Sequence, residues 1–578
     1  MPTMTPWRVV AEALKAEGVE RVFGLPGNPI HLVDDLVRHT RIDNVLVRHE
    51  HSGVALAFAH ARITGRPAVC YGNPGPGITN MATGLLEATA ASVPVICFAN
   101  GTPVATDGKG AFQELDAVDH LRPVTKWAVR IVDPATTPRI VSRAFALAKN
   151  GRPGAVFIDI PSDLGLRPVP VEPYAKSLPR QRTRPETAAV ELAAHMLARA
   201  RRPLLLCGSG AVAAAAFEQV RGLAERLGAP VFTTPGGRGI VSEDHALALG
   251  QVGLYFTKAG KDYYDQADLV FAIGSRLEDF STGAWTLYPK GAKLIQLDID
   301  PHAIAMNWRP AAALVGDAAL ALDDVLTALP RVAAVPRRNR VARLRKRKAA
   351  YLAQVHAEGQ VKRRPILTRQ VLAALNRVFG RDTILVNENG GADLWSYYWP
   401  YYRVRDAGDC IPMGEQTAMG MGVIGAIAAK LARPRKNVVC VTGDAAMQMA
   451  MMELATAAER KAGVTWVVLN NQALGWPQFI QNLEGQKEVA TNFAVSPDFA
   501  KLAEAQGCRG IKVEDPGAVE DALRQALAAN RRGIPVLLDV RIAKHDYPPH
   551  FVHFHKKVWG FGARGKAAAA RRVKGGGG

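Results

Sequence analysis

Several features that define other protein classes are missing from this sequence of 578 residues. No run of 18 uninterrupted apolar residues occurs, so the sequence predicts no membrane span. The N-terminal segment lacks the basic-then-apolar layout of a secretory signal and has the pattern of an amphipathic helix. No short-period repeat occurs, which argues against a solenoid. From these absences we expect a cytoplasmic protein.

Cysteine is scarce and scattered. The six cysteines form no CxxC pair, and several lie in apolar runs such as VICF and NVVCV. This distribution argues against a zinc site or a disulfide framework. It predicts buried free thiols in a reducing compartment.

Acidic residues are absent from two basic segments. Residues 337–348 hold eight Lys and Arg side chains and residues 556–578 hold seven, which together supply +15 of the net charge of +20. One interpretation is a solvated helix face and a solvated tail; the other is contact with an anionic partner, such as nucleic acid or the phosphates of coenzyme A. Because no base-stacking module or helix-turn-helix pattern is present, nucleic acid is the less favoured partner.

The rest of the sequence has the pattern of a globular α/β protein. Apolar residues make up 48% and charged residues 21% of the chain, both ordinary values. Short apolar runs such as AVCYG, PLLLCGSG and KNVVCVTGD alternate with amphipathic helices, and most end in Gly, Asn or Asp. This alternation predicts parallel sheets, with ligands at the carboxyl ends of the strands.

Two breaks rich in proline and charge, at 167–184 and 330–364, divide the chain. We therefore expect an α/β fold of three doubly wound parallel-sheet domains. The predicted boundaries are 1–165, 185–330 and 365–545, with residues 546–578 as a basic C-terminal tail or a lid.

The strongest motif lies in the third block, VVCVTGDAAMQMAMMELATAAERKAGVTWVVLNNQALG. Asp444 follows one predicted strand and Asn471 follows the next, so both lie at the same edge of the sheet. A carboxylate and an amide oxygen are ligands that Mg²⁺ prefers. The helix that begins near Ala446 directs its N-terminus to the same place, which favours a phosphate. The motif predicts a diphosphate site with Mg²⁺.

A second motif lies in the first block, NVLVRHEHSGVALAFAHARITGRPAVC, where Glu50 follows a strand and opens a helix. With both motifs present, the chain resembles the thiamine diphosphate (ThDP) enzymes. Their signature is Gly-Asp-Gly followed one β-α-β unit later by Asn, and Ala445 takes the third position here. The acetolactate synthase-like group is the most similar, over roughly residues 5–545.

The resemblance implies pyrimidine-binding, central and diphosphate-binding domains, in that order, and a role for each motif. Asp444 and Asn471 would bind Mg²⁺ through their side chains, and Ala473 through its backbone carbonyl. Glu50 would hydrogen-bond the aminopyrimidine ring of ThDP and begin the proton relay that activates the cofactor. We also expect His51 and Gln113 to handle protons near Glu50.

Further positional matches imply the other cofactor contacts. The turns at 24–27 (GLPG), 75–80 (GPGITN) and 387–391 (NENGG) resemble turns that approach the cofactor in this family. The predicted cofactor-binding residues are Gly24, Pro26, Gly27, Asn80, Asn389, Gly390, Thr417, Met419, Gly443, Ala445, Ala446 and Gly475. In the family the cofactor lies between subunits, which implies a homo-oligomer, either a dimer or a tetramer.

The implied activity is that of a ThDP- and Mg²⁺-dependent carbon–carbon lyase or carboligase acting on a 2-oxo acid or a 2-hydroxy carbonyl substrate. Three positions depart from the acetolactate synthase pattern: Phe280 replaces an arginine that holds the substrate carboxylate, Ile480 replaces a tryptophan, and Gly101 replaces a glutamine. These departures, with the basic segments, leave open a 2-hydroxyacyl-CoA lyase that acts on a CoA thioester. They also argue against FAD, which stays an open alternative for the central domain.

The aromatic segment at 395–402 is consistent with core packing, or with a pocket like that of a benzoylformate decarboxylase or benzaldehyde lyase. The non-enzyme alternative is a nucleic-acid-binding protein on a ThDP-type fold. The joint presence of Glu50, Asp444 and Asn471 argues against it.

Overall fold

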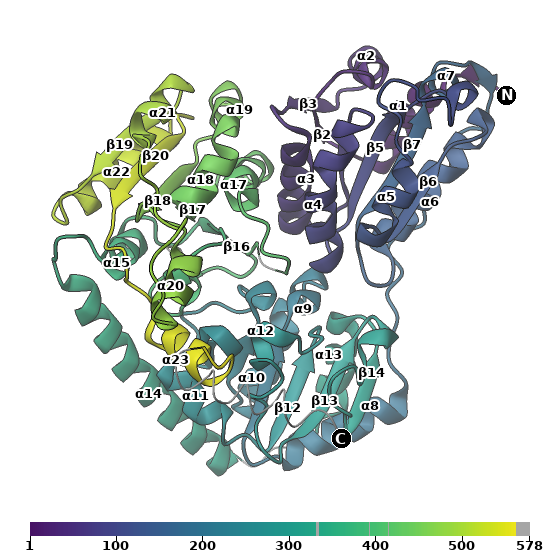
Figure 1. Ribbon diagram of the computed structural model, residues 1–578. Coiled ribbons are helices and arrows are strands. Elements are labelled where there is room, and N and C mark those ends of the chain that lie inside the picture. Colours follow the sequence, from purple (N-terminus) through teal and green to yellow (C-terminus); the bar gives the residue numbers. More distant parts are fainter. Residues whose placement is uncertain (331–333, 392–393, 414, 562–578) are drawn as a thin grey trace, which may run out of the picture. The chain divides into compact units, whose positions relative to one another are not determined.

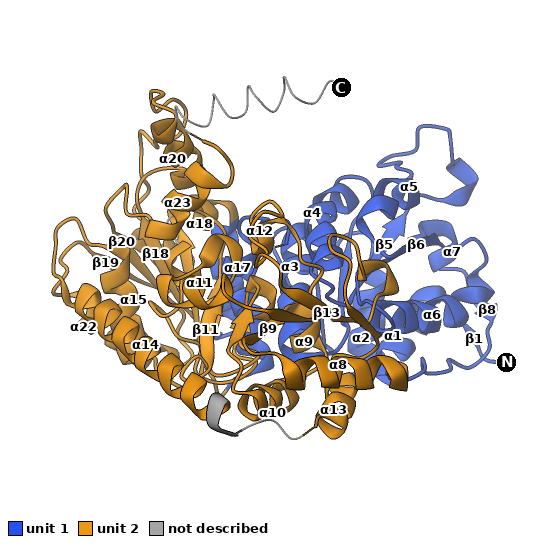
Figure 2. Ribbon diagram, turned by 90° about the horizontal axis from the view of Figure 1, so that it is seen from below, with its two compact units in different colours: residues 1–181, 413–434, 450–462 blue, residues 182–412, 435–449, 463–578 orange. Residues whose placement is uncertain are grey.

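The computed structural model describes residues 1–330, 334–391, 394–413 and 415–561 of the chain. The described part contains three six-stranded parallel sheets flanked by helices, which confirms the predicted α/β fold (Figure 1). It forms two compact units. Residues 1–181, 413–434 and 450–462 make unit 1, and the others make unit 2 (Figure 2). The predicted basic tail lies mostly in residues 562–578, outside the described residues.

Unit 1 is built on the first sheet, whose strand order is β3-β2-β4-β5-β7-β6. Its strands are β2 (Arg21–Gly24), β3 (Asp43–Leu46), β4 (Ala68–Gly72), β5 (Val95–Gly101), β6 (Trp127–Arg130) and β7 (Val156–Pro161). A small antiparallel pair joins β1 (Thr3–Met4) to β8 (Val169–Pro170). The apolar runs predicted as strands are buried along β4, β5 and β7.

The helices of unit 1 come from three parts of the chain. They are α1 (Pro6–Glu17), α2 (Ile30–His39), α3 (Glu50–Thr64), α4 (Pro76–Ala90), α5 (Ala117–Leu121), α6 (Thr137–Lys149), α7 (Ser162–Gly165), α17 (Met421–Ala432) and α19 (Leu454–Glu459). The N-terminal segment predicted as an amphipathic helix is α1. It begins after Thr5, whose hydroxyl accepts from the backbone N–H of Arg8, and ends at Gly18 in the left-handed conformation. Helix α17 packs against α3, where Gly425 lies close to Ala59.

The second sheet lies in unit 2 and has the order β11-β10-β9-β12-β13-β14. Its strands are β9 (Pro203–Cys207), β10 (Val231–Thr233), β11 (Ala248–Gln251), β12 (Leu269–Ile273), β13 (Lys293–Asp298) and β14 (Ala312–Val315). The helices around it are α8 (Thr187–Arg199), α9 (Ser209–Ala213), α10 (Phe217–Leu227), α11 (Lys258–Tyr264), α12 (Asp279–Thr282) and α13 (Ala318–Ala328). Apolar side chains from strands and helices form one continuous core.

The third sheet, also in unit 2, has the order β16-β15-β17-β18-β20-β19. Its strands are β15 (Thr383–Asn387), β16 (Cys410–Ile411), β17 (Asn437–Gly443), β18 (Thr465–Asn470), β19 (Arg509–Val513) and β20 (Val536–Arg541). The remaining helices are α14 (Ala334–Gln360), α15 (Thr368–Val378), α16 (Leu394–Tyr397), α18 (Asp444–Ala450), α20 (Gly475–Leu483), α21 (Phe499–Ala505), α22 (Val519–Asn530) and α23 (Pro549–Lys557). Strands β17 and β18 are hydrogen-bonded neighbours, as the β-α-β motif predicts.

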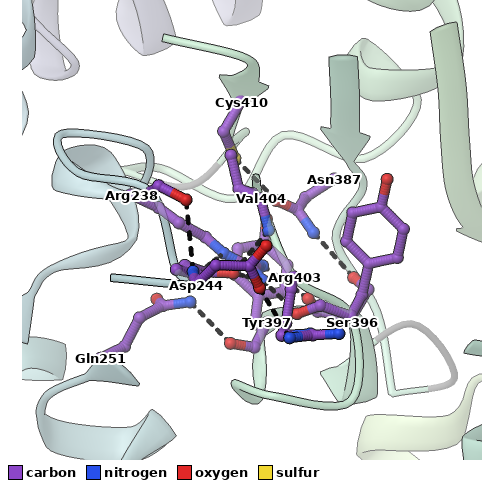
Figure 3. Close-up of polar contacts among 12 residues, drawn as sticks. Arg238, Asp244, Gln251, Asn387, Ser396, Tyr397, Arg403, Val404 and Cys410 are labelled. Atoms are coloured by element: carbon purple, nitrogen blue, oxygen red, sulfur yellow. Dashed lines mark hydrogen bonds and ion pairs between the residues drawn. The ribbon is translucent and has the colours of Figure 1, made fainter. Parts of the chain in front are cut away.

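A buried ion pair in unit 2 fixes the chain that follows α16. The guanidinium of Arg238 donates from Nε to Glu243 Oε1 at 2.9 Å and from Nη2 to Glu243 Oε2 at 3.1 Å. It also donates to the carbonyl oxygens of Ser396 and Tyr402, while the N–H of Val404 donates to Glu243 Oε2 (Figure 3). Burial alone lowers the pKa of Arg238, but the Glu243 carboxylate more than offsets this, so that its pKa lies above the ordinary value.

The same network extends to the turn after β15. Asn387 Nδ2 donates to Ser396 Oγ at 2.7 Å, and Gln251 Nε2 donates to the carbonyl of Tyr397 at 2.6 Å (Figure 3). Arg238 therefore holds the backbone of Ser396, whose side chain holds Asn387. The second and third sheets are linked through these contacts.

Much of the basic segment at 337–348 has structural contacts on α14. The Arg340 guanidinium donates to the backbone carbonyls of Arg201, Leu227 and Gly228. Lys348 Nζ donates to three carbonyls, the nearest that of His245 at 2.6 Å. The pattern predicted a solvated helix face, and side chains such as Arg338 and Arg345 are indeed exposed, but these two cations are buried within the fold.

All six cysteines are free and buried, as predicted. No helix among the described residues is long and apolar enough to span a bilayer.

Candidate active site

Glu50 lies at the first position of α3, in unit 1, and its side chain is buried. Each carboxylate oxygen accepts one hydrogen bond from a carboxamide: Asn73 Nδ2 donates to Oε1 at 3.3 Å, and Asn80 Nδ2 donates to Oε2 at 3.0 Å. Gly77 leaves no room for a side chain, because a Cβ there would lie 2.9 Å from Glu50 Oε1. The predicted residues Glu50 and Asn80 are thus in direct contact. Asn73 is a further residue of this site, which the sequence motifs did not identify.

The turn at 24–27 joins the same group through Asn73. Asn73 Oδ1 accepts from the N–H of Asn28 at 2.9 Å, and a Cβ at Gly27 would lie 2.1 Å from that oxygen. Gly24 packs against the ring of Tyr71, where a Cβ would lie 2.6 Å from ring carbons. Pro26 lies between them and is partly exposed. These small residues let the chain pass closely over the Glu50 region, as expected of a cofactor-binding turn.

His51 and Gln113 were both expected near Glu50. His51 follows it on α3, and its N–H donates to Nδ1 of His49 at 3.2 Å. Burial, with a contribution from His49, lowers the pKa of His51 to about 4, so the ring is neutral near pH 7. Gln113 has a positive φ of 63° and packs on Gly75, where a Cβ would lie 2.9 Å from the Gln113 carbonyl oxygen. Its contact is therefore with the start of α4.

A second functional candidate missed by the motif comparison is Glu87, a fully buried carboxylate on α4. It accepts from the backbone N–H groups of Glu415, Gln416 and Ala418, at 3.0, 3.1 and 3.4 Å. Burial raises the pKa of Glu87 despite these donors. The contacts fix the segment that carries the predicted cofactor residues Thr417 and Met419, both in unit 1.

In unit 2, the predicted Mg²⁺ ligands come together at the ends of β17 and β18. Asp444, Asn471 and Ala473 are each at most 3% exposed. The terminal carboxamide atom of Asn471 that faces Asp444 lies 3.2 Å from Asp444 Oδ1 and 3.1 Å from the Ala473 carbonyl oxygen. With nitrogen in this position the carboxamide would donate to both oxygens; with oxygen there, three oxygens converge and require a cation between them.

The oxygen orientation matches the geometry of Mg²⁺. Ligand oxygens about 2.0–2.1 Å from an octahedral Mg²⁺ lie roughly 3 Å from one another. Asp444 Oδ2 is buried and, among the described residues, has no hydrogen-bond partner. Burial raises the pKa of Asp444 to about 6, against nearby backbone N–H groups that lower it. A buried carboxylate oxygen without a donor is what a cation would satisfy.

The remaining predicted residues of the third block lie around these oxygens. Gly443 ends β17, Ala445 donates its N–H to Asp444 Oδ1 at 2.9 Å, and Ala446 is fully buried. Gly475 begins α20, and a Cβ there would lie 3.0 Å from Asn471 Nδ2.

The 387–391 turn packs on the same helix start. A Cβ at Gly391 would lie 2.7 Å from the backbone of Gly475 and Trp476. Asn389 Nδ2 is buried there without a partner among the described residues, next to Gly390. An unpartnered buried amide on a turn that packs against the start of α20 is a candidate ligand contact.

The structure shows what surrounds two of the three residues at which the sequence departs from the acetolactate synthase pattern. A Cβ at Gly101 would lie 2.2 Å from Asp159 Oδ1, so the Asp159 carboxylate fills the space of a side chain there. Asp159 pairs with Arg130 Nε at 3.3 Å. Phe280 meets Trp476 and Trp559 edge-to-face, with ring centroids 6.4 and 5.5 Å away.

The aromatic segment at 395–402 is core. Its six aromatic side chains are at most 6% exposed. Tyr397 stacks on Tyr255 of the central region at 5.1 Å, and Lys348 Nζ lies 5.1 Å from the Trp399 ring centroid. Of the two interpretations offered for this segment, the structure supports core packing.

Near the end of the described chain, α23 places His555 in an aromatic cluster. The Trp476 indole N–H donates to His555 Nε2 at 3.0 Å, and His555 Nδ1 lies 2.8 Å from the carbonyl oxygen of Phe551. Burial lowers the pKa of His555 to about 4, so this histidine is a neutral packing residue. Within the described ranges, no three His, Cys, Asp or Glu side chains cluster as a metal site.

Comparison with known families defines the class of protein. Residues 4–120 match the N-terminal TPP binding domain of the thiamine pyrophosphate enzymes, residues 190–328 their central domain, and residues 390–540 their C-terminal TPP binding domain. Thiamine pyrophosphate is thiamine diphosphate under another name. These three matches cover most of the chain and include strands of each of its three sheets.

Individual relatives define the group more narrowly. The chain is 33% identical to the probable acetolactate synthase large subunit of Methanocaldococcus jannaschii, over 92% of this chain and 91% of that protein. It is 34% identical to the acetolactate synthase large subunit of Parasynechococcus marenigrum, over 94% of this chain and 89% of that protein. It is 31% identical to the acetolactate synthase isozyme 3 large subunit of Escherichia coli, over 95% of this chain and 97% of that protein. The chain belongs to the thiamine pyrophosphate enzyme family, in its acetolactate synthase-like group.

The predicted class of activity is therefore confirmed: the chain is a ThDP-dependent enzyme of the carbon–carbon lyase and carboligase type. These relatives favour neither a CoA-thioester lyase, nor a benzaldehyde lyase-like enzyme, nor a nucleic-acid-binding protein.

Proposed function

We propose that the enzyme binds ThDP together with Mg²⁺ and joins two 2-oxo acids with loss of carbon dioxide, and that one product is acetolactate, which the names of its relatives give as theirs. The observation that carries the proposal is the convergence of Asp444, Asn471 and Ala473 at the ends of adjacent parallel strands. In this proposal the Asn471 carboxamide presents its oxygen, and Asp444, Asn471 and Ala473 would hold the Mg²⁺ that accompanies the diphosphate. When bound, ThDP supplies the nucleophilic carbon and stores the electron pair left by decarboxylation.

Glu50 has the role of a proton relay at the ring nitrogen of the cofactor. Asn73 and Asn80 donate to its two oxygens, which fixes the plane of the carboxylate. They leave lone pairs free, since a carboxylate accepts about four hydrogen bonds. Gly24, Gly27 and Gly77 keep side chains out of the surrounding space.

Other residues complete the proposed site. In unit 2, Gly443, Ala445, Ala446 and Gly475 allow the diphosphate to approach the backbone beside the oxygen cluster, where Asn389 Nδ2 has no other partner among the described residues. In unit 1, Glu87 positions the backbone on either side of Thr417 and thus Met419. His51, neutral near pH 7, and Gln113 are proposed to hold water or substrate rather than to act as charged acids.

The proposal includes a homo-oligomer in which one cofactor takes residues from two subunits, as the family resemblance implies. It does not include FAD. The glycines at the end of β9 are accounted for by packing, because a Cβ at Gly208 would lie 2.2 Å from the carbonyl oxygen of Gly274. Light scattering would measure the oligomer, and the visible absorbance of the purified protein would reveal a flavin.

A substrate panel with the ThDP- and Mg²⁺-loaded enzyme tests the function. The panel contains pyruvate, pyruvate with 2-oxobutyrate, benzoylformate and a 2-hydroxyacyl-CoA, with products read by mass spectrometry. We expect acetolactate from pyruvate, and a loss of about 10²- to 10⁴-fold in kcat for Glu50→Gln. Glu12→Gln, on a partly exposed carboxylate of α1, is the matched control. Turnover of benzoylformate or the CoA thioester alone would overturn the substrate assignment, and unchanged turnover in Glu50→Gln would overturn the role of Glu50.

A further inference from the structure

A cavity of about 500 Å³ lies in unit 2, and none of its lining residues is assigned to ThDP. It is formed by the C-terminal half of α14, by α15 and by the chain at 400–405. Its volume falls within the range of about 300–1,000 Å³ that small-molecule sites occupy. Leu352, Ala353, Ala373 and Pro400 supply an apolar wall.

The polar part of the wall contains His356, Asn376 and Tyr401 together with three arginines. Arg377, Arg403 and Arg405 line the cavity, and no Asp or Glu does so among the residues that the structure describes. Arginine presents a planar fork of N–H donors that matches carboxylate and phosphate groups. The lining therefore favours an anion over a neutral or cationic ligand.

The carboxylates behind this wall only partly neutralise it. Arg403 Nη1 contacts Asp244 Oδ1 at 2.6 Å, but the Asp244 carboxylate is also shared with Arg381 at 3.7 Å. Arg377 Nε contacts Glu520 Oε2 at 3.0 Å, and Glu520 is also paired with Arg524. Arg381 is paired more closely with Asp406, at 3.0 Å, so Asp244 mainly offsets the charge of Arg403. Glu520 is shared between Arg377 and Arg524, and Arg405 forms no ion pair among the described residues, so positive charge remains at the cavity.

Arg405 shows unused donor capacity. Its Nη2 donates to the carbonyl of Asn376 at 3.3 Å, while its Nε is buried and has no acceptor within the described part of the chain. A buried N–H without an acceptor is costly, so a small shift of the guanidinium that brings Nε to a ligand oxygen would be favourable. The wall is also held in place, because Asn376 Oδ1 accepts from the N–H of Arg403 at 3.1 Å.

We propose that this cavity is a binding site for a small organic anion. The carboxylate or phosphate of the ligand would contact Arg405, Arg403 and Arg377. The rest of the ligand would lie against Leu352 and Ala353 of α14 and against Pro400. Such a ligand would join α14 to α15 and thereby stabilise unit 2.

Calorimetric titration of the full-length protein tests the site, with citrate as the carboxylate probe and AMP as the phosphate probe. We expect one of them to bind, and Arg405→Gln to weaken that binding about tenfold or more, since charged hydrogen bonds are worth roughly 1.5–3 kcal/mol. Arg345→Gln, which removes an exposed arginine of α14 outside the cavity, should leave the affinity unchanged. Binding of citrate alone identifies a carboxylate ligand, and binding of AMP alone identifies a phosphate.

A second variant separates ligand contacts from effects on folding. Ala353→Phe places a ring in the cavity from an exposed position and keeps every charge. We expect it to lose binding while its thermal unfolding temperature without ligand stays near that of the wild type. Failure of both probes to bind the wild type would overturn the proposal. So would equal affinity in Arg405→Gln, or in Ala353→Phe.

Discussion

The buried pair of Arg238 and Glu243 makes a quantitative prediction about what holds the 396–404 segment. The two Glu243 oxygens accept three donors, Arg238 Nε and Nη2 and the N–H of Val404. In Glu243→Gln only one oxygen remains as an acceptor, and the new amide nitrogen meets donors instead. Removing one partner of a buried ion pair costs about 3–5 kcal/mol, because the other charge is left buried and unpaired.

Hydrogen exchange measured by mass spectrometry reports this loss of stability for individual segments of the chain. Since about 1.4 kcal/mol corresponds to a factor of ten, we expect amides at 396–404 to exchange roughly 100- to 4,000-fold faster in Glu243→Gln. Because Ser396 Oγ accepts from Asn387, the turn at 387–391 should also lose protection and ThDP should bind more weakly. Glu218→Gln, on an exposed pair with Arg221, is the control and should change exchange little.

The double variant Arg238→Met with Glu243→Met removes both buried charges. Its effect should be smaller than the sum of the two single variants, because neither charge is left unpaired. Exchange in Glu243→Gln within about threefold of the wild type, or strict additivity in the double variant, would refute the reasoning.

Three further predictions concern unit 1. Gly101→Ala should lower the thermal unfolding temperature, because the new Cβ would lie 2.2 Å from Asp159 Oδ1, and Asp159→Ala in the same chain should restore it; a melt of Gly101→Ala equal to the wild type would contradict the crowding. Burial raises the pKa of Asp159 to about 7 despite the nearby charge of Arg130, so the folded protein favours the protonated carboxyl. The stability that protonated Asp159 contributes to the folded protein is present below about pH 4 and is lost as the pH rises to about 7. Denaturant melts should therefore show the stability of the wild type relative to Asp159→Asn falling across that interval, and a constant difference would be inconsistent with the shift. Glu87→Ala should weaken ThDP binding about tenfold or more, measured by calorimetry, because three backbone N–H groups lose their acceptor; unchanged affinity would remove Glu87 from the site.

The fold was predictable because its signal is local. Strands such as β4, β5 and β17 are mostly apolar and almost entirely buried, as is typical of parallel strands covered on both faces. Adjacent parallel strands also bring their ends together, so the approach of Asp444 to Asn471 follows from the β-α-β motif.

Other site features depend on contacts between distant segments, which leave no local pattern. Asn73 follows β4 like many strand-end residues, and only the structure shows it bonded to Glu50. Glu87 is one acid in a mostly apolar helix, and the backbone N–H groups that donate to it lie more than 300 residues away. The packing of α17 on α3, which brings Thr417 and Met419 into unit 1, depends on close contacts such as Gly425 on Ala59. The aromatic segment was ambiguous because core and pocket have the same composition.

The most direct test of the proposed site is calorimetric titration of ThDP in Mg²⁺ and in EDTA. For the wild type we predict binding that requires Mg²⁺. Asp444→Asn should weaken ThDP binding about 100-fold or more, since it removes the charge from the oxygen cluster, whereas Asp515→Asn, on an exposed carboxylate, should not. Glu50→Gln should bind ThDP within about tenfold of the wild type yet lose turnover. Mg²⁺-independent binding, or wild-type affinity in Asp444→Asn, would contradict the assignment of Asp444, Asn471 and Ala473 as the ligands of the cation.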